Sequence, residues 1–251
     1  MSAQINAIYR YPVKGLSPES LDKVTLIANQ IIPNDRRFAI AHGSTDFPDG
    51  LCWLSKMHFL MLAKNPKLAQ LVSHFDDDTE ILTLERKGKR VSRGKLTDLT
   101  GCMLLEQFLV SFLGTESRGI PKIVENRKTA FTDIPDQQIS LINLASVKDL
   151  ERVVRKPVDP MRFRGNLYIE GLAAWEENNW IGKEIQIGEI TLEIVSPIGR
   201  CSATNVNLET AEVDMNIPKS LQSGYRHRNM GVYAVVKNTG EIKEKAPVTI
   251  I

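Results

Sequence analysis

The sequence predicts a mainly β fold with peripheral helices, of the α+β class, and three observations support this prediction. Short apolar segments recur along the chain and are separated by glycine and proline, which is typical of a β-barrel or a sandwich. Strands do not alternate regularly with helices, which argues against a doubly wound parallel sheet. The composition is that of an ordinary globular protein, with 42% hydrophobic and 25% charged residues in a chain of 251.

The first hundred residues are predicted to form a small β-rich unit with one helical insertion. Residues 5–9 alternate in character as a half-buried strand does, and Pro12 ends this strand. Residues 58–71 have a more helical pattern, with Pro66 as a break or a first-turn residue. Further strands are expected over residues 21–28, 37–42 and 80–85, and the last of these begins a hairpin that turns near Lys87 to Lys89.

A helix, a polar transition and a second β-rich unit are predicted for the rest of the chain. Apolar residues recur at spacings of three and four over residues 99–113, which indicates an amphipathic helix. Residues 114–137 are polar and are expected to be mainly loop, so we divide the chain into domains 1–115 and 116–251. After a strand at 139–142, a helix is expected to begin at a cap formed by Asn143 or Ser146. Further strands are expected over residues 166–170, 184–187, 190–195, 201–206 and 230–237.

Charge and cysteine usage exclude several classes of protein. The 32 Lys and Arg nearly balance the 30 Asp and Glu, which argues against a nucleic-acid partner and against a polybasic membrane anchor. No segment approaches the length of an apolar membrane span, and the N-terminal residues do not resemble a secretory signal. Cys52, Cys102 and Cys201 form no CxxC pair, which fits a reducing compartment. We therefore expect a cytoplasmic protein without a membrane span.

The familiar enzyme motifs are absent from the sequence. It contains no Walker loop, no GxGxxG after a strand, no GxSxG and no HExxH. The four histidines are scattered and lack the spacing of metal ligands, so each is better explained as a surface or core residue.

Cys201 is the cysteine with the most suggestive surroundings. It follows Arg200 and precedes Ser202, Thr204 and Asn205 in the segment SPIGRCSATNVN. Positive charge favours the thiolate, which is both a nucleophile and a soft metal ligand. Local composition alone nevertheless favours a small buried strand residue, because free cysteines are commonly buried.

Cationic residues also gather at the predicted ends of strands. Guanidinium and ammonium groups at such positions suit phosphate if they converge, although any one set alone is better explained as solvated surface charge. The sets are Lys14 in YPVKGLS, Arg36 and Arg37 in NDRRFAI, and Arg162, Arg164 and Asn166 in MRFRGN.

Taken together, these segments resemble the MOSC superfamily, which is named for the C-terminal domain of molybdenum cofactor sulfurase. The segments IYRYPVKGLSPESLDKV and NDRRFAIAH resemble the MOSC N-terminal β-barrel domain, and the chain from MRFRGN to GRCSATNVN resembles the MOSC core. The resemblance covers nearly the whole chain. It implies a MOSC-type β-barrel with an N-terminal β-barrel subdomain, similar to the YcbX-like and mitochondrial amidoxime-reducing component group.

The resemblance also implies a site for the molybdenum cofactor, a molybdopterin with a terminal phosphate. In that group a cysteine ligates molybdenum directly, and Cys201 matches it, so Cys201 is the expected metal ligand and catalytic residue. Pyridoxal phosphate binding is carried over only as a family-level association. The residues expected to bind the cofactor are Lys14, Arg37, Asn143, Ser146, Arg164, Asn166 and Thr204.

The sequence departs from the family pattern at several positions. Gly15, Gly165, Asn205 and Asn207 stand where relatives often carry Ser, Pro, Thr and Asp, which leaves the thiol and the main cations in place. The chain ends at Ile251 without the Cys-rich ferredoxin domain of YcbX-like relatives. Electrons are therefore expected from a separate donor protein of the ferredoxin or flavoprotein type.

Three functions remain open at this point. The leading one is a molybdenum-cofactor oxidoreductase that reduces small N-hydroxylated compounds. The second is a sulfur carrier or cofactor-handling protein that uses a persulfide on Cys201. The third is a noncatalytic scaffold with the MOSC fold.

Overall fold

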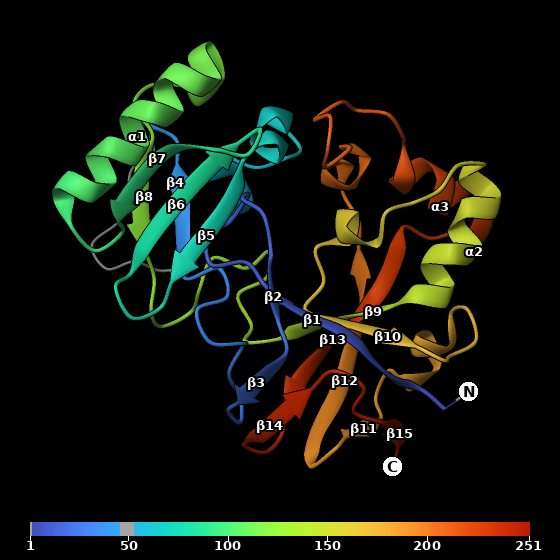
Figure 1. Ribbon diagram of the computed structural model, residues 1–251. Helices are drawn as coiled ribbons and strands as arrows, with labels where there is room; N and C mark the ends of the chain where they lie inside the picture. The colour runs from blue at the N-terminus through green and yellow to red at the C-terminus, as the bar shows by residue number, and fades with distance from the viewer. Residues whose placement is uncertain (1, 46–52) are drawn as a thin grey trace.

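The computed structural model describes residues 2–45 and 53–251, and it confirms a mainly β fold with peripheral helices (Figure 1). The longest sheet has eight strands in the order β15-β11-β12-β13-β9-β10-β1-β2. Its neighbours are antiparallel except for β10 and β9, which are parallel. The strands are β1 (Gln4–Arg10), β2 (Glu19–Leu21), β9 (Ile139–Asn143), β10 (Leu167–Glu170), β11 (Glu184–Ile187), β12 (Ile190–Gly199), β13 (Asn229–Val236) and β15 (Val248–Ile250).

This sheet closes on itself as a barrel. The Ile5 N–H donates to the Ala246 carbonyl at 2.9 Å, and the Lys245 N–H donates to the Ile5 carbonyl at 2.7 Å. These bonds join β1 to the chain that leads into β15, so the two sides of the sheet meet. Alternate side chains of the strands point inward, among them Ile185, Leu192 and Ile194, and form an apolar core with Ile5 and its neighbours.

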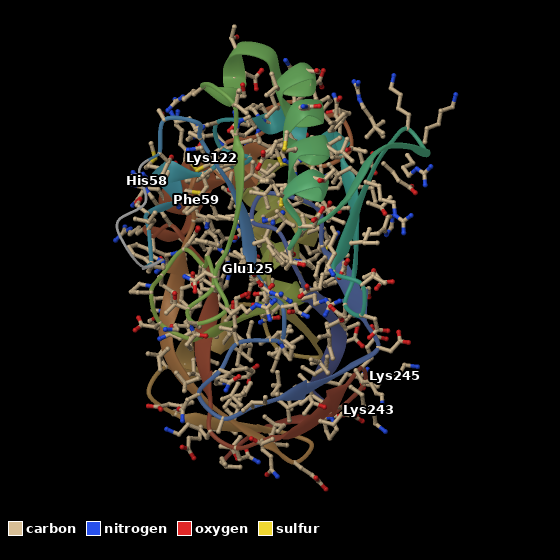
Figure 2. All side chains as sticks on the ribbon, turned by 90° about the vertical axis from the view of Figure 1, so that its left-hand side faces the viewer. His58, Phe59, Lys122, Glu125, Lys243 and Lys245 are labelled. Carbon is tan, nitrogen blue, oxygen red and sulfur yellow. The ribbon has the colours of Figure 1, made fainter. Side chains whose placement is uncertain are left out.

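A second β-rich body lies beside the barrel and has its own apolar core. Helix α1 (Leu99–Leu113) begins at Asp98, whose carboxylate accepts from the Gly101 N–H at 2.9 Å, and it buries Leu105 and Leu109 against the strands. Figure 2 shows Lys122 and Glu125 at the two ends of β8, beside this helix. The strands of this body are β4 (Phe38–Ala41) paired with β8 (Lys122–Glu125), and β5 (Val72–Asp76), β6 (Ile81–Arg86) and β7 (Lys89–Lys95) in one sheet.

Two helices cover the outer face of the barrel. Helix α2 (Leu144–Val154) follows β9 directly, and α3 (Ile217–Tyr225) packs against it. Their apolar residues, such as Leu150 and Leu221, pack with Ile142 and Tyr168 from the outside of the strands. None of the helices in the described parts of the chain has both the length and the apolar character needed to cross a membrane.

Strand pairing links the beginning of the chain to its end. Strand β1 pairs with β10, and β3 (Lys23–Leu26) pairs with β14 (Gly240–Lys243). Strand β8 lies after residue 115 but pairs with β4 in the second body. The division into 1–115 and 116–251 therefore stays a prediction, and the pairing places the first 26 residues with the barrel.

Two predicted elements are wrong. The segment 58–71 is not one helix: it begins at the last residue of the 3₁₀ turn Lys56–His58 and contains a second short 3₁₀ turn, Pro66–Gln70. Its Leu60 N–H bonds to the Ile40 carbonyl at 2.8 Å, which holds the chain against β4, and Pro66 is a first-turn residue, as predicted, but of the short turn Pro66–Gln70. The segment 201–206 is not a strand but a 3₁₀ turn over Ser202–Asn205.

Other elements were predicted with small differences or were missed. The predicted strand 21–28 is divided into β2 and β3, and Asn143, not Ser146, caps α2 by accepting from the Ala145 N–H at 2.9 Å. The predicted loop 114–137 contains β8 and a 3₁₀ turn at Gly114–Ser117. Strands β5, β14 and β15 and helix α3 were not predicted.

Candidate functional site

A cavity of about 470 Å³ lies where the barrel meets the second body. Its size is within the range of small-molecule sites. The N-terminal segment, the loop 132–138, the turn that leads into β10 and the chain after β12 all contribute side chains to its wall. The structure brings five of the eight predicted site residues to this cavity, namely Lys14, Arg164, Asn166, Cys201 and Thr204.

The cavity wall is strongly cationic. Clustered cations repel one another, and their desolvation is costly unless an anion accompanies them. Such a wall therefore favours an anionic ligand held by charge-assisted hydrogen bonds. Among the described residues that line the cavity, six are cationic (Lys14, Arg36, Lys56, Arg162, Arg164 and Arg200) and two are acidic (Asp133 and Asp136).

Cys201 lies at the start of a tight turn after β12. The Thr204 N–H and the Thr204 hydroxyl both donate to the Cys201 carbonyl, at 3.2 and 2.9 Å, and this fixes the backbone of the turn. The thiol is partly exposed to the cavity. Burial acts to lower the pKa of Lys56, but the carboxylate of Asp133 is the largest effect in the other direction, and the pKa is raised. Lys56 thus places a positive charge in the same cavity as the Cys201 thiol, and positive charge favours the thiolate form of a ligand.

Arg200, the residue before Cys201, has a buried guanidinium at the cavity wall. It donates to the Phe163 carbonyl at 2.8 Å and to the Met230 carbonyl at 2.8 Å. Burial lowers its pKa, although an arginine remains charged at neutral pH. No carboxylate among the described residues forms an ion pair with it, so its charge is available to an anion in the cavity.

Lys14 and Lys56 share one carboxylate, that of Asp133. The Lys14 ammonium lies 2.5 Å from Asp133 Oδ1 and also donates to the Phe131 carbonyl at 2.9 Å. The Lys56 ammonium lies 3.3 Å from Asp133 Oδ2. Burial lowers the pKa of Lys14, and Asp133 opposes this effect. Burial also acts to raise the pKa of Asp133, but the two lysines outweigh it and hold this pKa well below its usual range.

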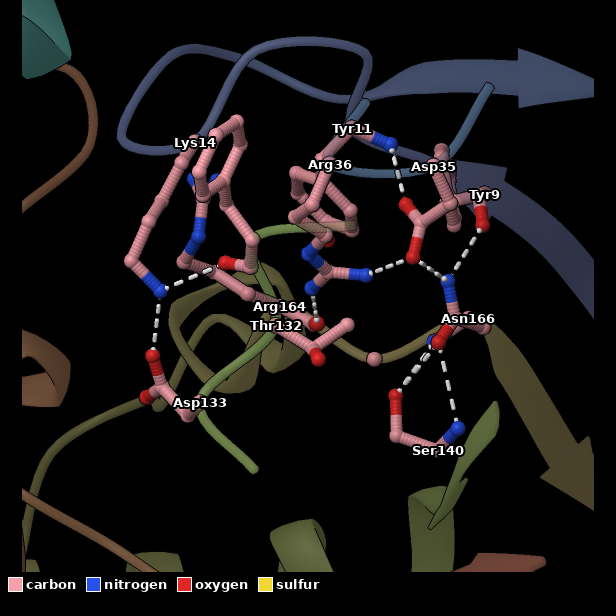
Figure 3. Close-up of polar contacts among 12 residues, drawn as sticks. Tyr9, Tyr11, Lys14, Asp35, Arg36, Thr132, Asp133, Ser140, Arg164 and Asn166 are labelled. Carbon is pink, nitrogen blue, oxygen red and sulfur yellow. Dashed lines mark hydrogen bonds and ion pairs between the residues drawn. The ribbon is translucent and has the colours of Figure 1, made fainter. Parts of the chain in front are cut away.

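Arg36 and Arg164 both pack on the ring of Tyr11, each with its guanidinium carbon 4.3 Å from the ring centroid (Figure 3). Both residues have left-handed backbone angles, with φ of 49° and 50°. Arg36 forms an ion pair with buried Asp35 and donates to the Arg164 carbonyl at 2.9 Å, and Arg164 donates to the Leu16 carbonyl at 2.8 Å. Both guanidiniums are thus fixed in place at the cavity wall.

Arg37, which was predicted as a cofactor contact, does not line this cavity. Its guanidinium pairs with Glu80 and Glu125, and it lines a separate hollow together with Asp35. Its positive charge is therefore compensated within the protein by two carboxylates. The neighbouring Arg36 stands at the cavity in its place.

Asn166 lies at the cavity, but its amide is fully occupied by the fold. Its carbonyl oxygen accepts from the N–H and the hydroxyl of Ser140, at 3.1 and 2.8 Å. Its NH₂ donates to the Tyr9 carbonyl and to Asp35, both at 3.2 Å (Figure 3). An asparagine amide has two donors and two acceptor positions, so this geometry makes Asn166 a link between strands.

Asn143 and Ser146, also predicted as cofactor contacts, lie away from the cavity. Both bond to the carboxylate of Glu177, with distances of 2.8 Å from Asn143 Nδ2 and 2.8 Å from Ser146 Oγ. Asn143 caps α2, and Ser146 accepts from the Trp175 N–H at 2.7 Å. These bonds connect the start of α2 to the chain after β10, where both side chains are buried.

The model of the MOSC N-terminal beta barrel domain matches residues 2–117, and the model of the MOSC domain matches residues 126–249. The chain belongs to the MOSC family.

Several curated proteins are similar to this MOSC chain. Mitochondrial amidoxime reducing component 2 of Bos taurus is 26% identical over 59% of this chain and 47% of its own length. Mitochondrial amidoxime-reducing component 1 of Homo sapiens is 26% identical over 58% and 50%. Molybdenum cofactor sulfurase of Oryza sativa is 28% identical over 47% of this chain and 15% of that protein. The chain thus spans about half the length of the amidoxime-reducing components it matches.

Among solved structures, the YUAD protein of Bacillus subtilis aligns over 100% of this chain and 96% of its own, with 13% identity and a TM-score of 0.45. YiiM of Geobacillus stearothermophilus aligns over 45% and 53%, with 22% identity and a TM-score of 0.35.

Sequence reasoning missed several residues of this MOSC cavity. Arg36, Arg162 and Arg200 lie in the motifs that we singled out, one or two residues from the predicted Arg37, Arg164 and Cys201, and this proximity was the signal. Lys56 and Asp133 have no signal in the sequence, because Lys56 lies in a short 3₁₀ turn and Asp133 in irregular chain, both outside every motif. Cys52 lies outside the described residues, and Cys102 lies elsewhere, with its Sγ donating to the Leu96 carbonyl at 3.2 Å.

The residues of the cavity fit a molybdopterin. The phosphate of a molybdopterin binds to cations, and cations outnumber carboxylates in the cavity wall. The metal that it carries binds to a soft donor, and the Cys201 thiol is such a donor. No group of three or more His, Cys, Asp or Glu side chains gathers as a metal site in the described part of the chain. A metal that arrives on an organic ligand therefore suits this cavity better than a bare ion held by side chains alone.

Proposed function

We propose that this chain binds the molybdenum cofactor in the 470 Å³ cavity and reduces small N-hydroxylated compounds with electrons from a separate donor protein. The observation that carries the proposal is the convergence of one thiol, Cys201, and six cationic side chains on a single cavity. The names of the amidoxime-reducing relatives support the choice of substrate class.

In this proposal each side chain at the cavity has a defined task. Cys201 binds the metal as a thiolate, and the turn held by Thr204 fixes its direction. Lys14, Arg36 and Arg164 bind the phosphate end of the cofactor by charge-assisted hydrogen bonds. Asn166 positions this set, because it ties Tyr9 and Asp35 to the strand that carries Ser140.

When bound, the cofactor supplies the two-electron redox change, while the protein supplies orientation and charge. The overall reaction consumes two electrons, provided by a donor of the ferredoxin or flavoprotein type, and two protons. It breaks the N–O bond, leaves the reduced nitrogen compound and releases water. The cationic wall keeps the anionic cofactor in place through this cycle.

Metal analysis of purified variants tests the proposal. From a host that makes the cofactor, the wild-type protein should carry about one molybdenum per chain, and Cys201→Ser should carry little, because a hydroxyl is a harder and far less acidic ligand. Cys102→Ser is the matched control and should keep its molybdenum. Circular dichroism should show the same fold in all three proteins.

Two results would contradict the proposal. If the wild-type protein contains no molybdenum when it is made in a host that produces the cofactor, the cofactor does not bind. If Cys201→Ser contains as much molybdenum as the wild type, Cys201 is not the metal ligand. A mass increase of one sulfur atom on Cys201 in molybdenum-free protein would instead support a sulfur carrier.

A further inference from the structure

Asp133 occupies the position where an anionic ligand would meet Lys14. Its two carboxylate oxygens lie 2.5 Å from the Lys14 ammonium and 3.3 Å from the Lys56 ammonium (Figure 3 shows the first contact). All three residues line the cavity. A phosphate that binds Lys14 therefore meets this carboxylate, and the two anions cannot both remain against the same cation without repulsion.

Lys14 is the fixed partner in this pair. It is buried, and its backbone N–H bonds to the carbonyl of Phe38, the first residue of β4, at 2.8 Å. A buried ammonium needs a counter-charge, because an unpaired buried charge is strongly unfavourable. The Phe131 carbonyl supplies one acceptor, and Asp133 supplies the negative charge.

Asp133 is the partner that can leave. Its side chain is 47% exposed, against 10% for that of Lys14, so water can solvate the carboxylate once it separates. It also lies in the segment 126–138, which contains no helix or strand. Separating the pair is therefore unfavourable mainly because Lys14 would be left buried without a counter-charge, and a bound anion would remove this penalty.

We propose that Asp133 is an internal counter-ion that sets the charge selectivity of the cavity. A ligand must carry enough negative charge to displace Asp133 from Lys14, so a phosphate dianion or monoester is accepted, and singly charged anions are excluded. This inference rests on the proposed function, because it assigns the phosphate end of the ligand to Lys14, beside Arg36 and Arg164.

Calorimetric titration with inorganic phosphate tests this role in the whole chain at constant ionic strength. Asp133→Asn keeps the shape of the side chain but removes its charge, and it should bind phosphate about tenfold more tightly than the wild type. Asp136→Asn is the matched control, because Asp136 lines the same cavity without forming an ion pair with any described residue, and it should stay within about twofold of the wild type. Chloride exchanged for another background anion at the same ionic strength should weaken phosphate binding more in Asp133→Asn than in the wild type.

A Lys14→Met background shows whether the effect passes through Lys14. There the Asp133→Asn change should bring no further gain in phosphate affinity, as expected when two residues act through one contact. Thermal unfolding of each variant identifies any protein that fails to fold. If Asp133→Asn alone fails to fold, Lys14→Met can still be compared with the chain that carries both Lys14→Met and Asp133→Asn.

Unchanged or weaker phosphate binding in Asp133→Asn would overturn the proposal. Weaker binding would mean that Lys14 needs the Asp133 carboxylate to stay protonated. An equal gain in the Lys14→Met background would also overturn it, because the competition would then lie at Arg36 and Arg164. These results are independent of molybdenum content, so failure here leaves the proposed function standing. Loss of molybdenum binding with the expected phosphate result would reject only the proposed function.

Discussion

At the scale of single residues, Glu177 is an unusual carboxylate outside the cavity. Its side chain is 1% exposed, and it is bonded by Asn143 and Ser146, but no cation among the described residues pairs with it. Burial is the main effect on its pKa and raises it, while the two hydrogen bonds oppose this shift. The folded protein therefore favours the protonated form more than the unfolded chain does.

This raised pKa predicts a direction for stability against pH. A group with a raised folded-state pKa contributes stability that is fully present below its unfolded pKa and is lost as pH rises through the folded value. The free energy of unfolding of the wild type relative to Glu177→Gln should thus fall as the pH increases from about 4 to about 8. Urea unfolding across this range measures the difference.

Glu189→Gln provides the control for this experiment, because Glu189 is exposed. Its difference from the wild type should change little over the same pH range. A wild-type advantage over Glu177→Gln that grew with pH would mean that the ionised carboxylate stabilises the start of α2.

At the scale of elements, α1 packs on β7 where two glycines meet. A Cβ atom added at Gly94 would lie 2.1 Å from the Gly101 carbonyl oxygen, which is backbone and cannot rotate away. Gly94→Ala should therefore destabilise the protein by about 1–3 kcal/mol, the usual cost of overpacking. That corresponds to a fall in Tm of about 2–4 °C for each kcal/mol in a protein of this size.

Differential scanning calorimetry of two variants measures this effect. Gly199→Ala is the matched control, because the nearest atom to its added Cβ, apart from its chain neighbours, is Asn229 Oδ1 at 3.9 Å. Its Tm should remain near that of the wild type. Equal Tm values for the two variants would show that α1 can move away from β7 at little cost.

The elements that could be predicted from the sequence are those whose pattern is local. The helix at 99–113 and strands such as 184–187 follow from amphipathic spacing within one segment. The segments 58–71 and 201–206 could not be predicted correctly, because their backbone conformation depends on particular hydrogen bonds. Leu60 bonds to β4, twenty residues away in the chain, and Thr204 closes a turn on Cys201.

The site shows the same limit. The sequence motifs correctly predicted five side chains of the cavity, but the sequence alone could not show whether Arg36 or Arg37 lines it. That choice depends on the left-handed backbone at Arg36 and on Glu80 and Glu125, which pair with Arg37 away from the cavity. Asn143 and Ser146 lie away from the cavity because both bond to Glu177, a carboxylate more than thirty residues later in the chain.

At the scale of the whole molecule, the beginning of the chain completes the barrel formed mainly by its end. Strand β1 lies between β10 and the segment 245–248, and β3 pairs with β14. Ile5, Ile8 and Leu26 from this N-terminal stretch are fully buried in the barrel core. The barrel therefore depends on residues that lie outside the 126–249 segment matched by the MOSC domain.

This dependence predicts that residues 126–251 alone do not fold cooperatively. Without β1, the barrel is open between β10 and β15, so the Ala246 carbonyl loses its partner and Leu167 and Ile169 lose contact with the N-terminal apolar residues. The fragment should unfold over a broad temperature range and show poorly dispersed amide signals in NMR. Joining residues 1–33 ahead of residue 126 through a flexible linker should restore a sharp transition, because it returns β1 and the buried Ile32 to the core. A sharp, reversible transition in the fragment alone would show instead that the barrel closes without β1, and that the N-terminal strands serve only to bring Lys14 and Arg36 to the cavity.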